Sequence, residues 1–298
     1  VRGPLLLRPL LRVAMAARVS FIGGGKVGCS LAHYLAADPA RGQKDVELAG
    51  FFSASAESAR AAADFAGGRA FASAEEATRE AELVFVTTPD GRIAEIAAQL
   101  AAAADASALN LAGKVFAHCS GALASDALSP LRERGAAVCS AHPLYAVSSR
   151  FDCWRELSQA WFTLEGDDEA TSLLQDLLSA RGNHVARIPA DQKTRYHAAA
   201  VMASNLVVGL YDMAASELTT CGFAPADAEA ALAALFLGNA HHIAEDGVEA
   251  SLTGPAARGD QATIDAHLSC LSGDSREVYR LLTEVLYRIA SRRATPHR

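Results

Sequence analysis

A glycine-rich turn between an expected strand and an expected helix constrains the fold of this chain more than any other feature. Arg18–Ile22 is a short run of β-branched and aromatic residues, which predicts a buried strand. A GxGxxG motif follows as Gly23-Gly24-Gly25-Lys26-Val27-Gly28, and residues 29–38 predict a helix. Gly23 permits a tight turn, Gly25 lets a pyrophosphate approach the backbone, and Gly28 lets the helix pack on the strand. In this context the motif predicts dinucleotide binding, and a glycine-rich turn without a ligand is the alternative.

The second expected strand, Val46–Phe52, ends without the acidic residue that binds the ribose 2′-hydroxyl in NAD sites. Ser53 and Ser55 follow it, and Arg60 lies further along. Two hydroxyls and a guanidinium could bind a 2′-phosphate, and no carboxylate would repel it. We therefore expect NADP(H) as the cofactor. The alternative is that a serine only caps the next helix and that Arg60 is a solvated surface residue.

Strands and helices continue to alternate along the first half of the chain. Leu83–Asp90, Lys114–Leu123 and residues 136–147 each predict a strand that runs into a loop, and a capping box at Ser73 and Glu76 starts one of the helices between them. This alternation predicts a doubly wound parallel sheet of the Rossmann type, an α/β fold. Ligands bind outside the carboxyl ends of such strands. Six residues are therefore expected at the cofactor edge: Thr87, Thr88, Pro89, His118, Ser120 and His142.

The pattern changes after Pro189. Strand signals stop there, and helices are expected at 191–222, 224–247, 261–272 and 275–293. We expect a Rossmann domain over 17–189 and an all-α domain over 190–298. Residues 1–16 are expected to be a disordered extension or a start-site artefact, with translation starting at Met15; a functional leader is the alternative.

The first of these helices carries the densest polar chemistry. At about 100° per residue, Lys193, His197, Ala200 and Ser204 fall on one stripe, and Asn205 lies on its flank. A lysine and a histidine on an otherwise apolar helix need partners or a cleft, and either could give a proton to a substrate. A nearby lysine would lower the pKa of the histidine. The alternative leaves Lys193 and His197 exposed and buries only Ser204 and Asn205.

Other candidate site residues depend on position alone. His118 and Ser120 follow a strand, where a nicotinamide ring would lie, and the alternative is a loop histidine and a turn serine. His142 precedes Pro143, which also fits a rigid turn. Arg258 follows a Gly-Pro turn and could bind a substrate carboxylate or phosphate, or pair with Asp260. No cysteine, histidine and carboxylate cluster has metal spacing, so no metal is expected.

Composition narrows the partners. A formal net charge of -7 argues against nucleic acid and anionic membranes as ligands. The six cysteines form no disulfide or zinc pattern, which is typical of a cytoplasmic protein with reduced thiols. No unbroken run of 18 apolar residues occurs, so no transmembrane helix is expected.

Several motifs in order carry a family resemblance: "SFIGGGKVG", "TTPD", "HCSGAL", "AHPL", "KTRYHAAAVMASN" and "LTGPAARGD". From Ala17 to about Leu286 the chain resembles the Rossmann-like and DUF2520-domain proteins. Wider relatives are pyrroline-5-carboxylate reductase, ketopantoate reductase, prephenate dehydrogenase and 6-phosphogluconate dehydrogenase. The resemblance implies an NADP-binding domain and a helical domain of the 6-phosphogluconate dehydrogenase C-terminal-like type. It also implies a homodimer through the helical domain and an active site in the cleft between the domains.

The related hydroxyacid dehydrogenases use a lysine and an asparagine on the first helix of the second domain. Lys193 and Asn205 are similar in type, but the relatives keep the asparagine one turn from the lysine, where this chain has His197. We therefore pair Lys193 with His197. The resemblance does not supply a substrate.

Together these observations predict an NADP-dependent oxidoreductase that transfers hydride between NADP(H) and a small carbonyl or imine substrate near Ser120. Lys193 or His197 would protonate the heteroatom, and His118, His142 or Arg258 would position a substrate anion. Two alternatives remain. One is a non-catalytic NADP(H)-binding redox sensor, and the other is an enzyme that exchanges hydride between NADP and a deazaflavin.

Overall fold

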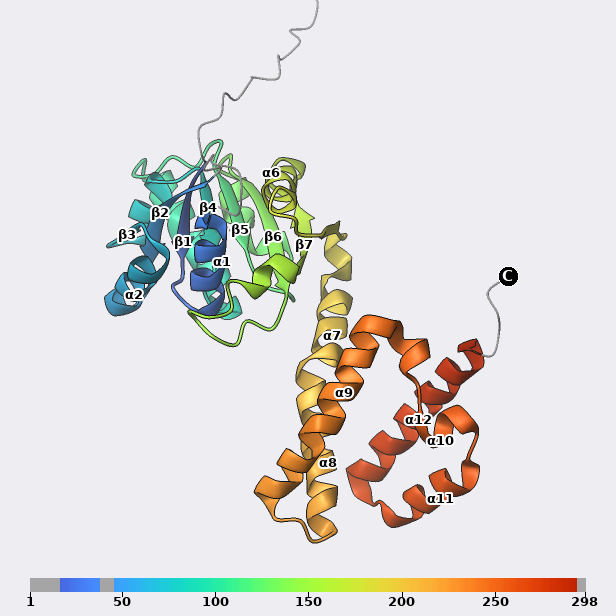
Figure 1. Ribbon diagram of the computed structural model, residues 1–298. Coiled ribbons are helices and arrows are strands. Elements are labelled where there is room, and N and C mark those ends of the chain that lie inside the picture. The colour runs from blue at the N-terminus through green and yellow to red at the C-terminus, as the bar shows by residue number, and fades with distance from the viewer. Residues whose placement is uncertain (1–16, 38–45, 294–298) are drawn as a thin grey trace, which may run out of the picture. The chain divides into compact units, whose positions relative to one another are not determined.

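The computed structural model describes residues 17–37 and 46–293 (Figure 1). The expectation of a disordered extension or a later start site falls on residues 1–16 and lies outside the described part. Contacts divide the chain into two units, Val1–Val201 and Met202–Arg298. The first contains the sheet and the second is helical, as the change of pattern in the sequence predicted.

One sheet forms the centre of the first unit, with strand order β3-β2-β1-β4-β5-β6-β7-β8. Its strands are β1 (Ala17–Ile22), β2 (Val46–Phe52), β3 (Arg69–Ala70), β4 (Leu83–Val86), β5 (Val115–His118), β6 (Ala137–Leu144), β7 (Trp161–Gly166) and β8 (Val185–Arg187). Neighbouring strands are parallel except β6 and β7, which are antiparallel. The order 3-2-1-4-5-6 is that of dinucleotide-binding sheets, so the predicted fold class is confirmed.

Helices cover both faces of this sheet. The α-helices of the unit are α1 (Lys26–Ala36), α2 (Ala56–Ala66), α3 (Ala74–Arg79), α4 (Asp90–Asp105), α5 (Ser129–Arg132), α6 (Asp168–Ser179) and α7 (Lys193–Ala203), with short 3₁₀ helices η1 (Ser125–Leu128), η2 (Glu156–Gln159) and η3 (Ala190–Gln192). Successive strand residues point to opposite faces, so Phe21 and Ile22 enter two different hydrophobic clusters. The Phe21 cluster includes residues of α1, α2 and α6, and the Ile22 cluster includes residues of α3, α4 and α5.

Local signals in the sequence fix several element ends. The Ser55 hydroxyl caps α2 by accepting the Ser58 N–H at 3.3 Å. The Ser73 hydroxyl accepts the Glu76 N–H at 3.1 Å, and the Glu76 carboxylate accepts the Ala72 N–H at 2.8 Å. The capping box is therefore formed almost as expected, with the return bond one residue earlier. The two-residue strand β3 was not expected, because two residues carry no periodic pattern.

The long helix expected over 191–222 is interrupted. Ser204 has φ −128° and ψ −82°, which is not helical, so the segment forms α7 and then α8 (Asn205–Thr220). The division between the units falls at Val201, later than the boundary at 189 expected from the loss of strand signals. The side chain of Lys193 explains this, since it is buried in the sheet unit and ties α7 to it.

The second unit contains α8, α9 (Pro225–Ser251), α10 (Gly254–Arg258), α11 (Gln261–Cys270) and α12 (Gly273–Arg293). Gly247, with φ 80° and ψ 170°, breaks the helical course of α9. The Gly-Pro segment at 254–255, expected to be a turn, begins the short helix α10. An apolar pocket of about 630 Å³ lies within this unit, lined by residues of α8, α9, α10, α11 and α12.

One stretch of the described helices, Ala190–Thr220, is long and apolar enough to span a membrane by length and composition alone. The sequence, which has no unbroken apolar run of 18 residues, predicts no transmembrane helix. A single such stretch is weak evidence, because helices in the core of globular proteins meet the same criterion.

Candidate functional site

The glycines of the turn after β1 have distinct structural roles. Gly23 has φ +122°, and a Cβ there would lie 2.6 Å from the Thr87 carbonyl carbon. A Cβ on Gly28 would lie 2.2 Å from the Gly23 oxygen and 2.6 Å from the Thr87 hydroxyl oxygen. Gly25 is different, because no heavy atom lies within 4 Å of a Cβ built on it. Two glycines thus permit close packing, and the third leaves open space at the N-terminus of α1, where free N–H groups and the helix dipole favour a phosphate.

Register places the ends of β1, β4 and β5 in one row with the middle of β6. Ile22 of β1 pairs with Val86 of β4, Val86 with His118 of β5, and His118 with Ser140 of β6. The residues after these partners therefore meet at the carboxyl edge of the sheet, where α/β proteins bind ligands. The glycine turn and the histidine loop after β5 thus share one edge of the sheet.

The loop after β4 also reaches this edge. The Thr87 hydroxyl donates to the Gly23 carbonyl oxygen at 2.8 Å, and Pro89 precedes the first turn of α4. The hydroxyl of Thr88 is buried and has no hydrogen-bond partner within the described part of the chain. Unsatisfied buried hydroxyls are rare, so Thr88 marks a position where a ligand could bind.

The residues expected to recognise a 2′-phosphate follow β2. Ser55 caps α2, as the alternative interpretation proposed, while Ser53 is half-buried and Arg60 is exposed. Sequence analysis missed Arg150, whose guanidinium donates to the carbonyl oxygen of Ser58 at 2.6 Å and to its hydroxyl at 3.0 Å. This places a second cationic group at the start of α2.

A polar layer covers one face of β6 and β7. In this antiparallel pair Ser140 lies opposite Glu165, and His142 lies opposite Thr163. Opposite residues share one face, so these four side chains form two adjacent rungs. The side chains of α7 meet this layer, beginning with Lys193.

Lys193 is 1% exposed. Its ammonium donates to the Ser120 carbonyl oxygen at 2.9 Å and to the Ser140 hydroxyl at 2.7 Å. Burial lowers the pKa of Lys193, and the charge of Glu165 opposes this most strongly. The structure contradicts the alternative in which the start of the helix is exposed and only Ser204 and Asn205 are buried. Lys193 is buried, while Ser204 and Asn205 are exposed.

Two histidines and a tyrosine complete this cluster. His142 Nδ1 and the Tyr196 hydroxyl are 2.7 Å apart. A Cβ on Gly121 would lie 2.8 Å from His197 Nδ1 and 3.0 Å from His142 Nε2, so both rings converge on this glycine. His197 Nδ1 is buried and has no hydrogen-bond partner among the described residues. Burial, aided by the charges of Lys193 and His197, lowers the pKa of His142 to about 4, so this ring is neutral at pH 7.

His118 and Ser120 are both engaged in the loop after β5. His118 Nδ1 accepts the Ser120 N–H at 3.2 Å, and its Nε2 lies 3.1 Å from the Ala124 carbonyl oxygen. Burial lowers the pKa of His118. The Ser120 hydroxyl donates to Asp90 at 2.7 Å and accepts two backbone N–H groups of the following turn. Both side chains lie at the expected edge, with their polar atoms bound to protein.

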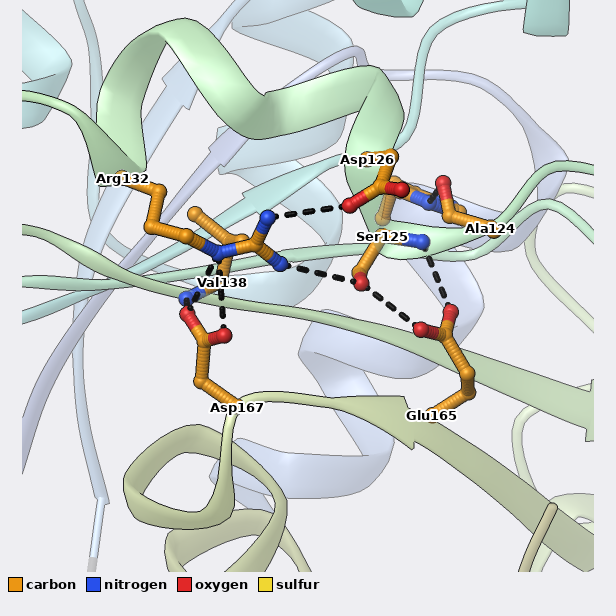
Figure 2. A network of polar contacts seen from close by, with 8 residues as sticks. Ala124, Ser125, Asp126, Arg132, Val138, Glu165 and Asp167 are labelled. Carbon is orange, nitrogen blue, oxygen red and sulfur yellow. Dashed lines mark hydrogen bonds and ion pairs between the residues drawn. The ribbon is translucent and has the colours of Figure 1, made fainter. Parts of the chain in front are cut away.

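Glu165 is a buried carboxylate that the sequence analysis missed (Figure 2). The Ser125 N–H and the Ser125 hydroxyl each donate to one of its oxygens, both at 2.7 Å. Arg132 donates to the same hydroxyl at 3.3 Å and also binds Asp167 and Asp126. An acidic residue inside the apolar strand "WFTLEG" was the available signal, since a buried carboxylate needs partners.

Two predicted site residues belong to the helical unit. Asn205 is exposed at the start of α8, and Arg258 is exposed at the end of α10. Asp260 does not form an ion pair with Arg258 within 4 Å but caps α11, accepting from Thr263. Across residues 17–37 and 46–293, no group of three or more histidine, cysteine or acidic side chains could hold a metal.

Comparisons with known proteins agree with the motif resemblance. A Rossmann-like domain model matches residues 11–143, and a model for DUF2520, a domain of unknown function, matches residues 160–285. These matches confirm the resemblance drawn from the motifs. The comparison with curated proteins finds no match.

Solved structures share the fold over nearly the whole chain. A Thermotoga maritima protein is 27% identical with a TM-score of 0.70, covering 93% of this chain and 100% of its own. A candidate NADP oxidoreductase from Bacteroides fragilis is 21% identical with a TM-score of 0.66, covering 92% and 98%. A pyrroline-5-carboxylate reductase from Coxiella burnetii is 14% identical with a TM-score of 0.60, covering 95% and 100%. At these identities the last two establish similarity of fold.

The glycine geometry gives a stability prediction. Gly28→Ala should destabilise the sheet unit by roughly 1–3 kcal/mol, because its Cβ would collide with backbone. Gly25→Ala should cost less than about 1 kcal/mol, because its Cβ enters open space. Urea unfolding followed by tryptophan fluorescence measures this, since both tryptophans, Trp154 and Trp161, lie in the sheet unit. Equal loss in the two variants would contradict the assigned roles.

Proposed function

We propose that this chain is an NADP(H)-dependent oxidoreductase that transfers hydride between its cofactor and the C=O or C=N carbon of a small molecule. One observation carries the proposal. The open glycine turn over α1 and a cluster of buried Lys193 with partly buried histidine and tyrosine side chains lie at the same edge of one sheet. The names of two proteins with a similar fold, an NADP oxidoreductase candidate and a pyrroline-5-carboxylate reductase, support this reaction class.

The cofactor would occupy the carboxyl edge. In the turn from Gly23 to Gly28, which includes Gly24, Lys26 and Val27, the backbone would bind the pyrophosphate, because Gly25 leaves the space open. Thr87, Thr88 and Pro89 would border it, and the unpaired Thr88 hydroxyl fits a ligand oxygen. Ser53, Ser55 and Arg60 would bind the 2′-phosphate. When bound, the nicotinamide supplies or accepts the hydride.

The proton would come from the layer above β6. His197 offers a buried ring nitrogen without a protein partner, so it is our proton donor. Lys193 offers a fixed ammonium beside it, which stabilises negative charge on the substrate heteroatom. His118 and Ser120 would shape the floor of this site, and His142 would contact the substrate. We also keep Asn205 and Arg258 of the helical unit as proposed site residues. Asn205 would contribute an amide and Arg258 a cation.

The cofactor assignment is tested by binding. NADPH should bind more tightly than NADH, measured by the fluorescence of the reduced nicotinamide. Arg60→Ala should weaken NADPH binding about tenfold or more and leave NADH binding unchanged, because a guanidinium bond to phosphate is lost. Arg92→Ala is the matched control, since Arg92 is an exposed helical arginine that pairs only with Glu95 at 3.0 Å.

Equal affinity for NADPH and NADH would mean that Ser53, Ser55 and Arg60 only form the start of a helix and do not bind a 2′-phosphate. If neither cofactor binds, the oxidoreductase proposal fails. Tight NADPH binding with no turnover across keto acids and imines would point to a redox sensor instead.

The proton donor is tested by turnover on a substrate found in that screen. His197→Ala and Lys193→Met should each lower kcat about 100-fold or more, because general acid catalysis and the stabilisation of developing charge each contribute factors of this size. His184→Ala is the control, because His184 is exposed and stacks on Trp161 away from this cluster. Full turnover in both site variants would remove them from the mechanism.

We also propose that the helical unit forms a homodimer. Several large apolar side chains on its helices are exposed, including Leu206 at 59%, Val208 at 71%, Leu235 at 71% and Leu237 at 56%. Monomers rarely expose apolar patches of this extent, so these side chains need a partner surface. A second copy of the chain is the partner that the family resemblance implies.

Light scattering should therefore give twice the 31.1 kDa mass of the chain. Leu235→Glu combined with Leu237→Glu should halve that mass, because two carboxylates would be buried in the interface. Ala98→Glu adds the same charge to an exposed position of α4 and should leave the dimer intact. A monomeric wild-type protein would contradict the proposal.

A further inference from the structure

The sheet unit buries two opposite charges that do not form an ion pair with each other. Lys193 is 1% exposed and Glu165 is 7% exposed. The ammonium binds the Ser120 carbonyl and the Ser140 hydroxyl, both neutral. The carboxylate is bound by the backbone and hydroxyl of Ser125. Each charge is satisfied by its own hydrogen bonds. The remaining contribution is the electrostatic interaction between the two charges.

Strand register brings these two groups together. Ser140 of β6 lies opposite Glu165 of β7 in the antiparallel pair. Opposite residues have Cβ atoms roughly 4.5–5.5 Å apart on the same face. The Ser140 hydroxyl oxygen is 2.7 Å from the Lys193 nitrogen. Glu165 is therefore one residue away from the ammonium, across a buried layer where charges are weakly screened.

The other titratable groups around Lys193 do not provide a buried negative charge. Burial raises the pKa of the Cys119 thiol to about 12, so the thiol is neutral, and burial keeps His118 and His142 neutral by lowering their pKa. Asp90 of α4 is acidic, but it is exposed to water. Two further groups of α7 complete the surroundings, Tyr196, whose pKa is raised by burial, and His197. Glu165 is thus the buried acidic side chain of this layer.

A chain of donors holds the Glu165 carboxylate in place. Both oxygens of Glu165 accept bonds from Ser125, and Arg132 donates to the hydroxyl of Ser125 from the other side (Figure 2). Arg132 is itself fixed by Asp167 and Asp126. Asp167 also accepts the Val138 N–H at 2.8 Å, which ties the network to β6.

We propose that Glu165 is a positioning residue that keeps Lys193 an ammonium ion, and that Ser125 and Arg132 hold the Glu165 carboxylate in place for this purpose. The inference deepens the proposed function and rests on it, because an ammonium can stabilise negative charge on a substrate and a neutral amine cannot. The protonation of Lys193 is nevertheless measurable without any turnover.

The sign of the expected change follows from the charges. Burial lowers the pKa of Lys193, and the Glu165 carboxylate raises it. Removing the carboxylate should lower this pKa further, so the amine becomes neutral at a lower pH. Glu165→Gln keeps the size of the side chain and removes its charge.

The chain has only four lysines, Lys26, Lys44, Lys114 and Lys193, so ¹³C labels at the lysine Cε give a simple NMR spectrum. Lys193→Arg assigns the Lys193 signal by its absence. In Glu165→Gln the titration midpoint of Lys193 should fall by about one pH unit or more relative to wild type. Lys114, partly buried beside Glu82 at a different place, is the internal control and should not move.

Asp126→Asn is the matched control variant. It removes an exposed carboxylate that binds the same arginine, and it should leave the Lys193 midpoint unchanged. Ser125→Ala should lower the midpoint less than Glu165→Gln does, because the carboxylate stays but loses one bond. Ser125→Ala also decides the matter if Glu165→Gln does not fold.

An unchanged Lys193 midpoint in folded Glu165→Gln overturns the inference. The same holds for an unchanged midpoint in Ser125→Ala where only that variant folds. NADPH titration of the wild-type protein tests the proposed function separately. If one of the two proposals fails its test, the test of the other therefore remains informative.

Discussion

A buried ammonium needs hydrogen-bond acceptors, and Lys193 finds them in one loop and one strand that are remote from it in sequence. Ser120 follows β5 and Ser140 lies in β6, and both bind the Lys193 nitrogen. These bonds fix the first turn of α7 on the sheet unit. They also bring Tyr196 and His197, one turn further along, to the layer over β6 and β7. The geometry of the site therefore follows from satisfying one charge.

The antiparallel direction of β7 supplies pairs of directly opposed polar side chains, which a fully parallel sheet would lack. Because β6 and β7 are antiparallel, Thr163 and Glu165 lie directly opposite His142 and Ser140. The Tyr196 hydroxyl bonds to His142, and Thr163 also bonds to Tyr196. Tyr196 of α7 thus contacts both strands at the His142–Thr163 rung, and Lys193 binds the other rung through Ser140 of β6.

Features encoded by neighbouring residues could be predicted, and features encoded by register could not. The turn Gly23–Gly28, the strand Val46–Phe52 and the serine caps depend on residues within one turn of each other, and the structure contains all of them. Glu165 becomes part of the site only through pairing with β6, which no local pattern reveals. The break at Ser204 was missed because the apolar character of α7 continues into α8.

Satisfied and unsatisfied polar atoms divide the carboxyl edge into two parts. His118 and Ser120 have their polar atoms bound within the protein, so they are rigid supports, and two hydrogen bonds fix the Lys193 ammonium beside them. Thr88 and His197 each keep a buried polar atom without a partner in the described chain. Burying such atoms is unfavourable, and proteins retain them mainly where a ligand or water completes the bond. Under the proposed function, cofactor and substrate would bind where the protein leaves its own hydrogen bonding incomplete.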